Sequence, residues 1–273
     1  MQITNSRPTP AQEKAHFDTN GYLIVRDILS PAQLSELRTQ IARSLAGNEP
    51  QFGDFEIQWE PACAGRADLP RSQRIRVMFN LCHRDPWFWG HATRPELVDV
   101  VENLIGPDLE LYTDQMFVKG PYHGSEVPYH QDSPYWPIEP EGILSCWLAV
   151  DDATEENGCV RVIPGSHKQA ITHSSFSGAQ SLGLHQHQVD AAKEVPMVMS
   201  AGSCMFHHSL LIHRSLPNTS PAPRRGLVSI YVAAATRFTG PWDFRYGFKT
   251  IRGSRGHRQP GWADHHEPVT SRA

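Results

Sequence analysis

Two kinds of hydrophobic pattern divide the chain near residue 106. Before that point, apolar residues in 30–47 and 84–105 recur at the three- and four-residue spacing of an amphipathic helix. Residues 9–21 add a third predicted helix, with a threonine cap signal at its start and a glycine at its end. The compact apolar run 22–29 fits a buried strand. The first hundred residues therefore predict a mainly helical segment with one early strand.

After residue 106 the pattern changes to short β-type runs that alternate with turn signals. The runs are LELYTDQMFVKG (109–120), GILSCWLAVDD (142–152), CVRVIPGSH (159–167), VPMVMSAGSCMFHHSLLIHRS (195–215) and RRGLVSIYVAAAT (224–236). Strands at this spacing are typical of an antiparallel barrel or sandwich. The predicted fold class is mainly β with flanking helices.

The chain shows no internal repeat and no clear linker, so we expect one domain over residues 1–273. Its helical support covers about 1–105 and its β core about 106–240. The tail after 240 is basic, glycine-rich and weakly periodic, which predicts an extended or partly disordered arm. Residues 49–81 are irregular and rich in proline and charge, so we expect a long loop or lid there.

Composition narrows the class of protein and its partners. Hydrophobic residues make up 39% of the chain and charged residues 20%, as in an ordinary globular protein. The net charge of −4 argues against a nucleic acid or an anionic membrane as the main partner. The five cysteines form no C-x-x-C motif, so neither a disulfide framework nor a zinc knuckle is indicated. With no signal-peptide pattern and no apolar run long enough to span a bilayer, we expect a cytoplasmic protein.

The pattern His-x-Asp, which could supply two ligands to one metal ion, occurs three times. The occurrences are His16/Asp18, His83/Asp85 and His130/Asp132. A helix would point the first two side chains to nearly opposite sides. In the second pair the aspartate precedes a proline at a helix start, which favours capping. The third pair lies in an extended context, where residues two apart face the same way about 6.5 Å apart, and is the favoured metal pair.

A third ligand is expected from the histidines that follow in the next β-type run. This segment contains His207, His208 and His213, and two arginines, Arg224 and Arg225, come after it. Two histidines and one carboxylate on one face of an ion leave three positions open, which suits non-haem Fe(II) and O2. An arginine on the next strand would pair bidentately with a carboxylate of a co-substrate. Neighbours in a strand face opposite sides, so one of the two arginines faces the interior.

Four segments of the chain carry a resemblance to a known family. They are FDTNGYLIVRDILSPAQLSELR, YHQDSPYWP, CWLAVDDATEENGCVRVIPGSHK and FHHSLLIHRSLPNTSPAPRR. In this order, between about residues 17 and 235, they resemble the phytanoyl-CoA dioxygenase family of Fe(II)/2-oxoglutarate-dependent oxygenases. The resemblance implies a double-stranded β-helix, or jelly-roll, core with helices packed outside it.

The resemblance also implies a set of site residues. His130, Asp132 and His213 would hold the Fe(II), and Arg224 with Ser215 would hold the far carboxylate of 2-oxoglutarate. In related halogenases an alanine or glycine stands at the position of the aspartate and leaves a slot for chloride. Because Asp132 fills that slot, hydroxylation or desaturation is expected and halogenation is not.

Four nearby residues are also singled out, and three of them have two interpretations each. Gln131 either contacts the co-substrate or substrate, or is structural. Trp147 is expected to pack under the site and to contact 2-oxoglutarate. Trp136 either lines the substrate side or packs within its loop. Lys119 either meets a carboxylate or, as the slightly favoured interpretation, is a solvated charge at a strand end.

These residues lead to two hypotheses about function. In the first, the protein is an enzyme that uses Fe(II), 2-oxoglutarate and O2 to hydroxylate or desaturate an unactivated C–H bond of a small molecule, releasing succinate and CO2. Residues 49–81 and 123–127 are then the candidates for shielding the site from water. In the alternative, the chain is a jelly-roll metal-binding protein without oxygenase activity, which leaves Arg224 unexplained.

Overall fold

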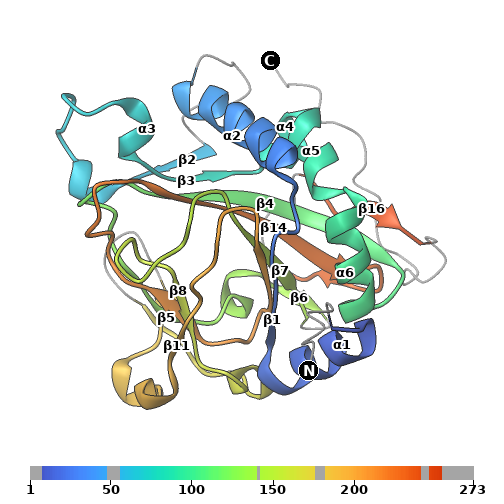
Figure 1. The fold of residues 1–273 in the computed structure, drawn as a ribbon. Coiled ribbons are helices and arrows are strands. Elements are labelled where there is room, and N and C mark those ends of the chain that lie inside the picture. Colours follow the sequence, from blue (N-terminus) through green and yellow to red (C-terminus); the bar gives the residue numbers. More distant parts are fainter. Residues whose placement is uncertain (1–7, 48–55, 140–141, 176–181, 241–245, 254–273) are drawn as a thin grey trace, which may run out of the picture.

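Two antiparallel sheets form the body of the protein (Figure 1). The computed structural model describes residues 8–47, 56–139, 142–175, 182–240 and 246–253. The larger sheet has the order β1 (Tyr22–Val25), β12 (Cys204–His208), β7 (Leu144–Ala149), β14 (Arg224–Ala233), β4 (Leu109–Lys119), β3 (Ile75–Phe79) and β2 (Ile57–Trp59), with β16 (Lys249–Arg252) also on β4. The smaller sheet has the order β11 (Val195–Pro196), β8 (Val160–Val162), β13 (His213–Ser215) and β5 (Val127–His130).

Short elements complete the strand inventory of the described residues. Two-residue strands pair as β6 (Ile138–Glu139) with β15 (Arg237–Phe238), and as β9 (Ser174–Ser175) with β10 (Leu182–Gly183). The two larger sheets face each other as an open jelly roll and do not close into a barrel. The predicted fold class, mainly β with flanking helices around a jelly-roll core, is therefore confirmed.

Helices cover the outer face of the larger sheet (Figure 1). The helices are α1 (Pro10–Asn20), α2 (Pro31–Ala46), α3 (Arg71–Arg74), α4 (Leu81–Arg84), α5 (Pro86–Ala92) and α6 (Pro95–Ile105). Complete capping boxes start the first two, at Thr9 and Ser30, and glycines in the left-handed conformation end them. The single helix expected over 84–105 is two helices, because Arg94 is extended before the proline that starts α6. Asp85 caps α5, as predicted, by accepting from the Trp87 amide.

The long loop or lid expected over residues 49–81 is wrong where this segment forms strands. Residues 57–59 and 75–79 are strands of the larger sheet, and Ile75 and Met78 are fully buried. The alternation of arginine with apolar residues hides this strand in the sequence. Residues 48–55 lie outside the described part of the chain. In the C-terminal tail, β16 extends the sheet beside β4, so this part of the tail is a strand and not a free arm.

The core has two layers, and strand alternation assigns side chains to them. On β14, Leu227 and Tyr231 face the helices, whereas Val228 and Ile230 face the space between the sheets. Trp147 of β7 joins this second layer, which forms the floor of the site described below.

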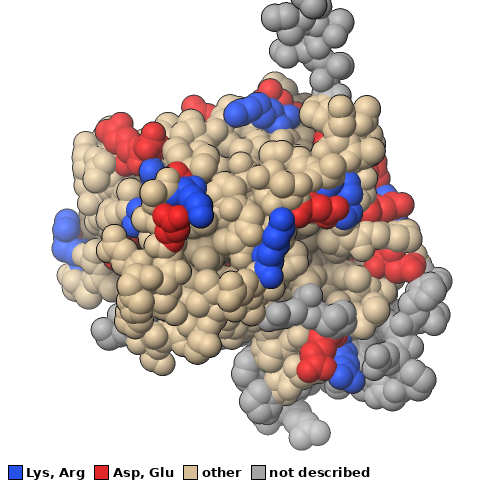
Figure 2. Space-filling view, turned by 90° about the horizontal axis from the view of Figure 1, so that it is seen from below, with Lys and Arg blue, Asp and Glu red and all other residues tan. Residues whose placement is uncertain are grey.

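The surface carries charged side chains of both signs. On the face seen in Figure 2, acidic and basic side chains are interspersed among uncharged ones. None of the described helices has the length and apolar character needed to cross a membrane.

His91 links the stability of the fold to pH. It is 2% exposed, its Nδ1 has no hydrogen-bond partner, and burial lowers its pKa to about 3. The unfolded chain, with a histidine pKa of about 6.5, therefore binds the proton first as pH falls. Stability present at neutral pH is lost between about pH 6.5 and pH 3.

We expect the unfolding free energy of the metal-free protein to fall by about 2 to 3 kcal/mol between pH 7 and pH 4.5 through this residue alone. Urea denaturation at both pH values measures it. In His91→Phe, which keeps the ring beside Trp87, that part of the pH dependence should be absent. An unchanged pH dependence in the variant would contradict the assignment.

Candidate active site

Two neighbouring strands of the smaller sheet carry the predicted metal ligands. His130 ends β5 and His213 begins β13, and the two residues are direct partners in the strand register. Asp132 also lies beside these histidines, but its backbone does not have the extended conformation that the sequence predicted. Its backbone is helical, with φ −72° and ψ −34°, and its amide donates to the Ser209 carbonyl at 2.7 Å. The chain therefore turns after β5, and this turn brings the carboxylate back to the histidines.

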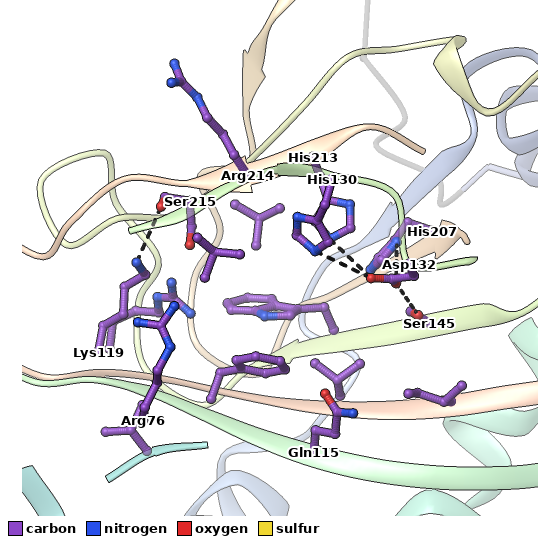
Figure 3. Close-up of a pocket in the computed structure, with 18 of the residues that line it drawn as sticks. Arg76, Gln115, Lys119, His130, Asp132, Ser145, His207, His213, Arg214 and Ser215 are labelled. Carbon is purple, nitrogen blue, oxygen red and sulfur yellow. Dashed lines mark hydrogen bonds and ion pairs between the residues drawn. The ribbon is translucent and has the colours of Figure 1, made fainter. Parts of the chain in front are cut away.

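The three side chains converge on one point at the smaller sheet (Figure 3). The Nε2 atoms of His130 and His213 each lie 3.6 Å from Oδ1 of Asp132, and one ligand atom from each residue lies within 4.8 Å of the others. Each imidazole donates its Nδ1–H to a backbone carbonyl at 2.9 Å, of Pro128 and Leu211 respectively. These bonds leave both Nε2 lone pairs facing the carboxylate. The donor set fits a 2-His-1-carboxylate metal centre.

Burial prepares these groups to bind a cation at neutral pH. It lowers the pKa of His130 to about 3, so this imidazole is neutral and its lone pair is free for a metal. Burial alone would raise the pKa of Asp132, but the surrounding imidazoles and the Ser145 hydroxyl lower it below its ordinary value. The aspartate is therefore an anion, and binding displaces no proton from either residue.

Of the three histidines in the segment 204–215, His213 is the one that belongs to the candidate metal-binding group with His130 and Asp132. His208, on the other face of β12, is half-buried and packs near His167. His207 is 3% exposed and borders the centre, with its Nδ1 3.9 Å from Oδ2 of Asp132. That atom has no hydrogen-bond partner, and burial lowers the pKa of His207 to about 4.

A buried arginine lies in the same cavity as the metal ligands. Arg224 begins β14, is 2% exposed, and donates from Nη2 to the Gly158 carbonyl at 2.7 Å. Its guanidinium stands 5.4 Å from the ring of Trp147, and its Nε has no partner. Burial lowers its pKa to about 10, so it keeps its charge. Arg225 faces away and pairs bidentately with Asp151, so the predicted strand register is confirmed.

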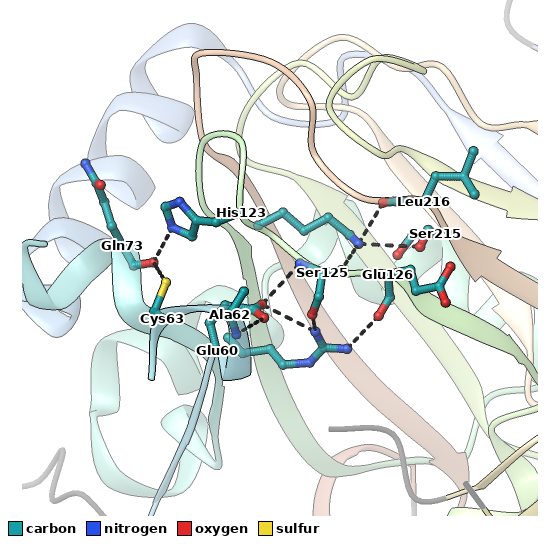
Figure 4. Close-up of polar contacts among 11 residues, drawn as sticks. Glu60, Ala62, Cys63, Gln73, His123, Ser125, Glu126, Ser215 and Leu216 are labelled. Carbon is teal, nitrogen blue, oxygen red and sulfur yellow. Dashed lines mark hydrogen bonds and ion pairs between the residues drawn. The ribbon is translucent and has the colours of Figure 1, made fainter. Parts of the chain in front are cut away.

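Lys119 is not the solvated strand-end charge that the sequence favoured. It is 4% exposed, and its Nζ donates to the carbonyls of Leu216, at 2.8 Å, and Ser215, at 3.4 Å (Figure 4). Burial lowers its pKa to about 6. The side chain is buried because the turn after β4 folds over it. This turn passes so close that a Cβ placed on Gly124 would lie 2.7 Å from the Cα of Lys119. The chain itself covers the side chain.

Sequence reasoning missed one cation of this cavity, Arg76. It extends from β3 and donates to the Glu126 carbonyl at 2.9 Å and to Oε2 of Glu60 at 3.4 Å (Figure 4). The available signal was a charged residue inside the apolar strand IRVMF. The cavity lining thus includes three buried basic side chains, Arg76, Lys119 and Arg224. Figure 3 shows Arg76 and Lys119 at the end of the cavity away from Asp132.

The remaining predicted residues divide into two groups. Ser215 and Trp147 line the cavity, and a Cβ at Gly226 would come within 2.4 Å of the Trp147 ring, so only glycine lets the indole lie flat there. Trp136 also lines it and meets Tyr112 edge to face.

Gln131 does not line the cavity. Its amide donates to the carbonyls of Gln169 and Leu210, at 2.8 and 2.7 Å, and accepts from the Ile171 amide. The structural interpretation of this residue is therefore the one that its contacts match, and its side chain is not directed at the co-substrate.

The chain is similar to known proteins over most of its length. The sequence profile of the family phytanoyl-CoA dioxygenase (PhyH) matches residues 17–226. The chain belongs to this family. The resemblance inferred from the four sequence motifs is therefore confirmed.

Individual relatives support this assignment. Phytanoyl-CoA dioxygenase 1 of Oryza sativa subsp. japonica is 34% identical over 239 residues, which are 77% of this chain and 84% of the relative. The peroxisomal phytanoyl-CoA dioxygenase of Homo sapiens is 24% identical over 234 residues, 82% of this chain and 68% of that one. Among solved structures, EctD from S. alaskensis with 2-oxoglutarate and 5-hydroxyectoine superposes with a TM-score of 0.72 at 25% identity, covering 95% of this chain and 91% of that one.

As a member of this family, the chain is a dioxygenase that uses Fe(II), 2-oxoglutarate and O2. Its own residues fit both cofactors. His130, Asp132 and His213 offer the nitrogen and carboxylate donors that ferrous iron accepts. The unpartnered Nε of Arg224 and the hydroxyl of Ser215 fit the far carboxylate of 2-oxoglutarate.

Proposed function

We propose that this dioxygenase hydroxylates an unactivated C–H bond of a small-molecule substrate. The proposal rests on one observation: a complete His-Asp-His set and the buried guanidinium of Arg224, whose Nε has no hydrogen-bond partner, line the same cavity. A protein that only bound a metal would have no use for Arg224, whose burial costs free energy. The carboxylate of Asp132 favours hydroxylation, or desaturation, over halogenation.

The protein's part in the reaction is binding, orientation and exclusion of water. Iron and co-substrate supply the oxidative decarboxylation of 2-oxoglutarate to succinate and CO2 and the oxidation of the substrate C–H bond. Arg224 and Ser215 bind the far carboxylate at one end of the cavity, and Trp147 keeps that end dry. At the other end, Asp132 and the two histidines fix the position of the metal. The substrate is expected beside Trp136, on the metal side of the cavity.

Succinate formation tests this proposal. The metal-free protein is reconstituted with Fe(II) without oxygen, then mixed with 2-oxoglutarate, air and members of a metabolite library. We expect iron-dependent succinate release that one compound class stimulates, together with a product heavier by one oxygen atom in mass spectrometry. A product lighter by two hydrogens would indicate desaturation. Iron binding without any succinate release would favour the alternative of a metal-binding protein without oxygenase activity.

A reducing, cytoplasmic location agrees with the cysteines. All five are free and buried, including Cys146 and Cys204, whose sulfur atoms lie 2.9 Å apart. Free thiols in such proximity are expected where the cell keeps thiols reduced. Fractionation of the producing cell, followed by detection of the native chain, tests the location.

Lys119 should support the co-substrate end of the cavity. In Lys119→Met the side chain keeps its length but loses its donors, which leaves the Ser215 and Leu216 carbonyls unsatisfied. We expect the unfolding free energy to fall by about 2 kcal/mol and the KM for 2-oxoglutarate to rise, because Ser215 is no longer held. Urea denaturation and succinate kinetics measure the two effects. Lys193→Met, at an exposed position, is the control, and an equal response of both variants would contradict the role.

A further inference from the structure

The carboxylate of Asp132 has two different oxygen environments. Oδ1 faces the two metal-binding imidazoles, at 3.6 Å from each Nε2. Oδ2 points the other way, toward β7 and β12, where Ser145 donates its hydroxyl to it at 3.0 Å (Figure 3). Ser145 is 1% exposed, so the donor of this hydrogen bond is shielded from bulk solvent. One oxygen is therefore free for a metal, and the other is engaged by the protein.

His207 stands on the same side as Ser145. The two residues are direct partners in the register of β12 and β7, so both side chains reach Oδ2 from adjacent strands of the larger sheet. The Nδ1 of His207 lies 3.9 Å from Oδ2, about 1 Å longer than a hydrogen bond. This atom is buried and has no other partner. A shift of the ring toward Oδ2 would therefore break no hydrogen bond at Nδ1.

We infer that His207 and Ser145 act together as positioning residues that hold Oδ2 of Asp132 and keep its carboxylate monodentate on the iron. The inference rests on the proposed function. With Oδ2 bound by two donors, Oδ1 is the single ligand atom, and the three protein ligands leave three positions open. Bound 2-oxoglutarate would take two of them, and O2 would need the third. A bidentate carboxylate would occupy that third position.

The test uses nitric oxide as a probe for the O2 position. It compares wild type with Ser145→Ala/His207→Phe, which removes both donors, in the anaerobic complex with Fe(II) and 2-oxoglutarate. We expect the double variant to bind nitric oxide at least about 10-fold more weakly, the size usual for groups that orient metal ligands. Its Fe(II) affinity should stay within about 3-fold of wild type or increase, because the released Oδ2 would add a second oxygen ligand and offset the loss of about 10- to 100-fold that is usual when orienting groups are removed. Electron paramagnetic resonance of the iron–nitrosyl species and competitive metal titration give the two quantities.

Two further variants separate positioning from general damage to the fold. Ser145→Ala/His207→Asn restores an N–H near the place of Nδ1 and should recover most of the nitric oxide affinity. His208→Phe, the next residue on β12 with its ring on the opposite face, should behave as wild type. Equal losses of Fe(II) and nitric oxide affinity, or no loss at all, would overturn the inference. If wild type itself forms no Fe(II)–2-oxoglutarate complex with visible charge-transfer absorption, the proposed function fails instead.

Discussion

Replacing His213 with alanine should abolish iron-dependent succinate formation. The variant loses one of three ligands that meet within 4.8 Å of one another. Groups that only orient a metal ligand are worth about 10- to 100-fold in metal affinity, so loss of a ligand itself should cost more than about 100-fold. The same holds for His130→Ala.

The measurement is Fe(II) affinity of the metal-free protein, determined anaerobically by competition with a chromophoric chelator, beside succinate release. His208→Ala is the matched control, because it removes an imidazole five residues away that lies on the other face of β12. Circular dichroism checks that the variants fold. Wild-type iron affinity in His213→Ala would show that the metal centre is elsewhere.

The metal ligands could be predicted because they depend on short-range pattern and on family motifs. His130 and Asp132 are two residues apart, and His213 stands two residues before Ser215 in a recognisable strand motif. The geometry that joins them could not be predicted in the same way. The sequence suggested an extended segment, whereas the turn at Asp132 depends on the Ser209 carbonyl, which is distant along the chain.

The basic residues at one end of the cavity could be predicted from the sequence only in part. Strand alternation predicted that one of Arg224 and Arg225 faces the interior, and the family resemblance pointed to Arg224, which lines the cavity in the structure. Lys119 and Arg76 are buried because the turn at 120–126 and Glu60 cover their side chains. A local sequence pattern does not show this cover. A lysine at a strand end looks exposed until such a turn is known to cover it.

The prediction of a lid over 49–81 failed for a related reason. The strand at 75–79 has an arginine among its apolar residues, and this interrupts the hydrophobic run that marks a buried strand. In the structure that arginine enters the cavity and is bound by Glu60, Ser125 and the Glu126 carbonyl. The departure from the apolar pattern therefore marks a residue of the site.

Replacing Arg224 with leucine should make the metal-free protein more stable and remove its affinity for 2-oxoglutarate. Among the described residues, no carboxylate lies within ion-pair distance of this guanidinium, and burial already lowers its pKa to about 10. An apolar side chain of similar bulk avoids that cost, so we expect a gain of about 1 kcal/mol in unfolding free energy. Loss of a charged hydrogen-bonding partner should raise the KM for 2-oxoglutarate by about 100-fold, since such bonds are worth about 1.5 to 3 kcal/mol each.

Arg225→Leu is the matched control, because it makes the same substitution on the next residue of the same strand. It breaks the bidentate pair with Asp151, whose bonds measure 2.8 and 2.6 Å. We therefore expect this variant to lose about 1 kcal/mol of stability and to keep its KM for 2-oxoglutarate. The two neighbours should respond with opposite signs in urea denaturation, and only Arg224→Leu should respond in succinate kinetics. If Arg224→Leu binds 2-oxoglutarate like wild type, this cation serves the fold alone. If both variants are destabilised alike, the hydrogen bond from Arg224 to the Gly158 carbonyl outweighs the cost of burying the charge, and the guanidinium serves the fold and not a co-substrate.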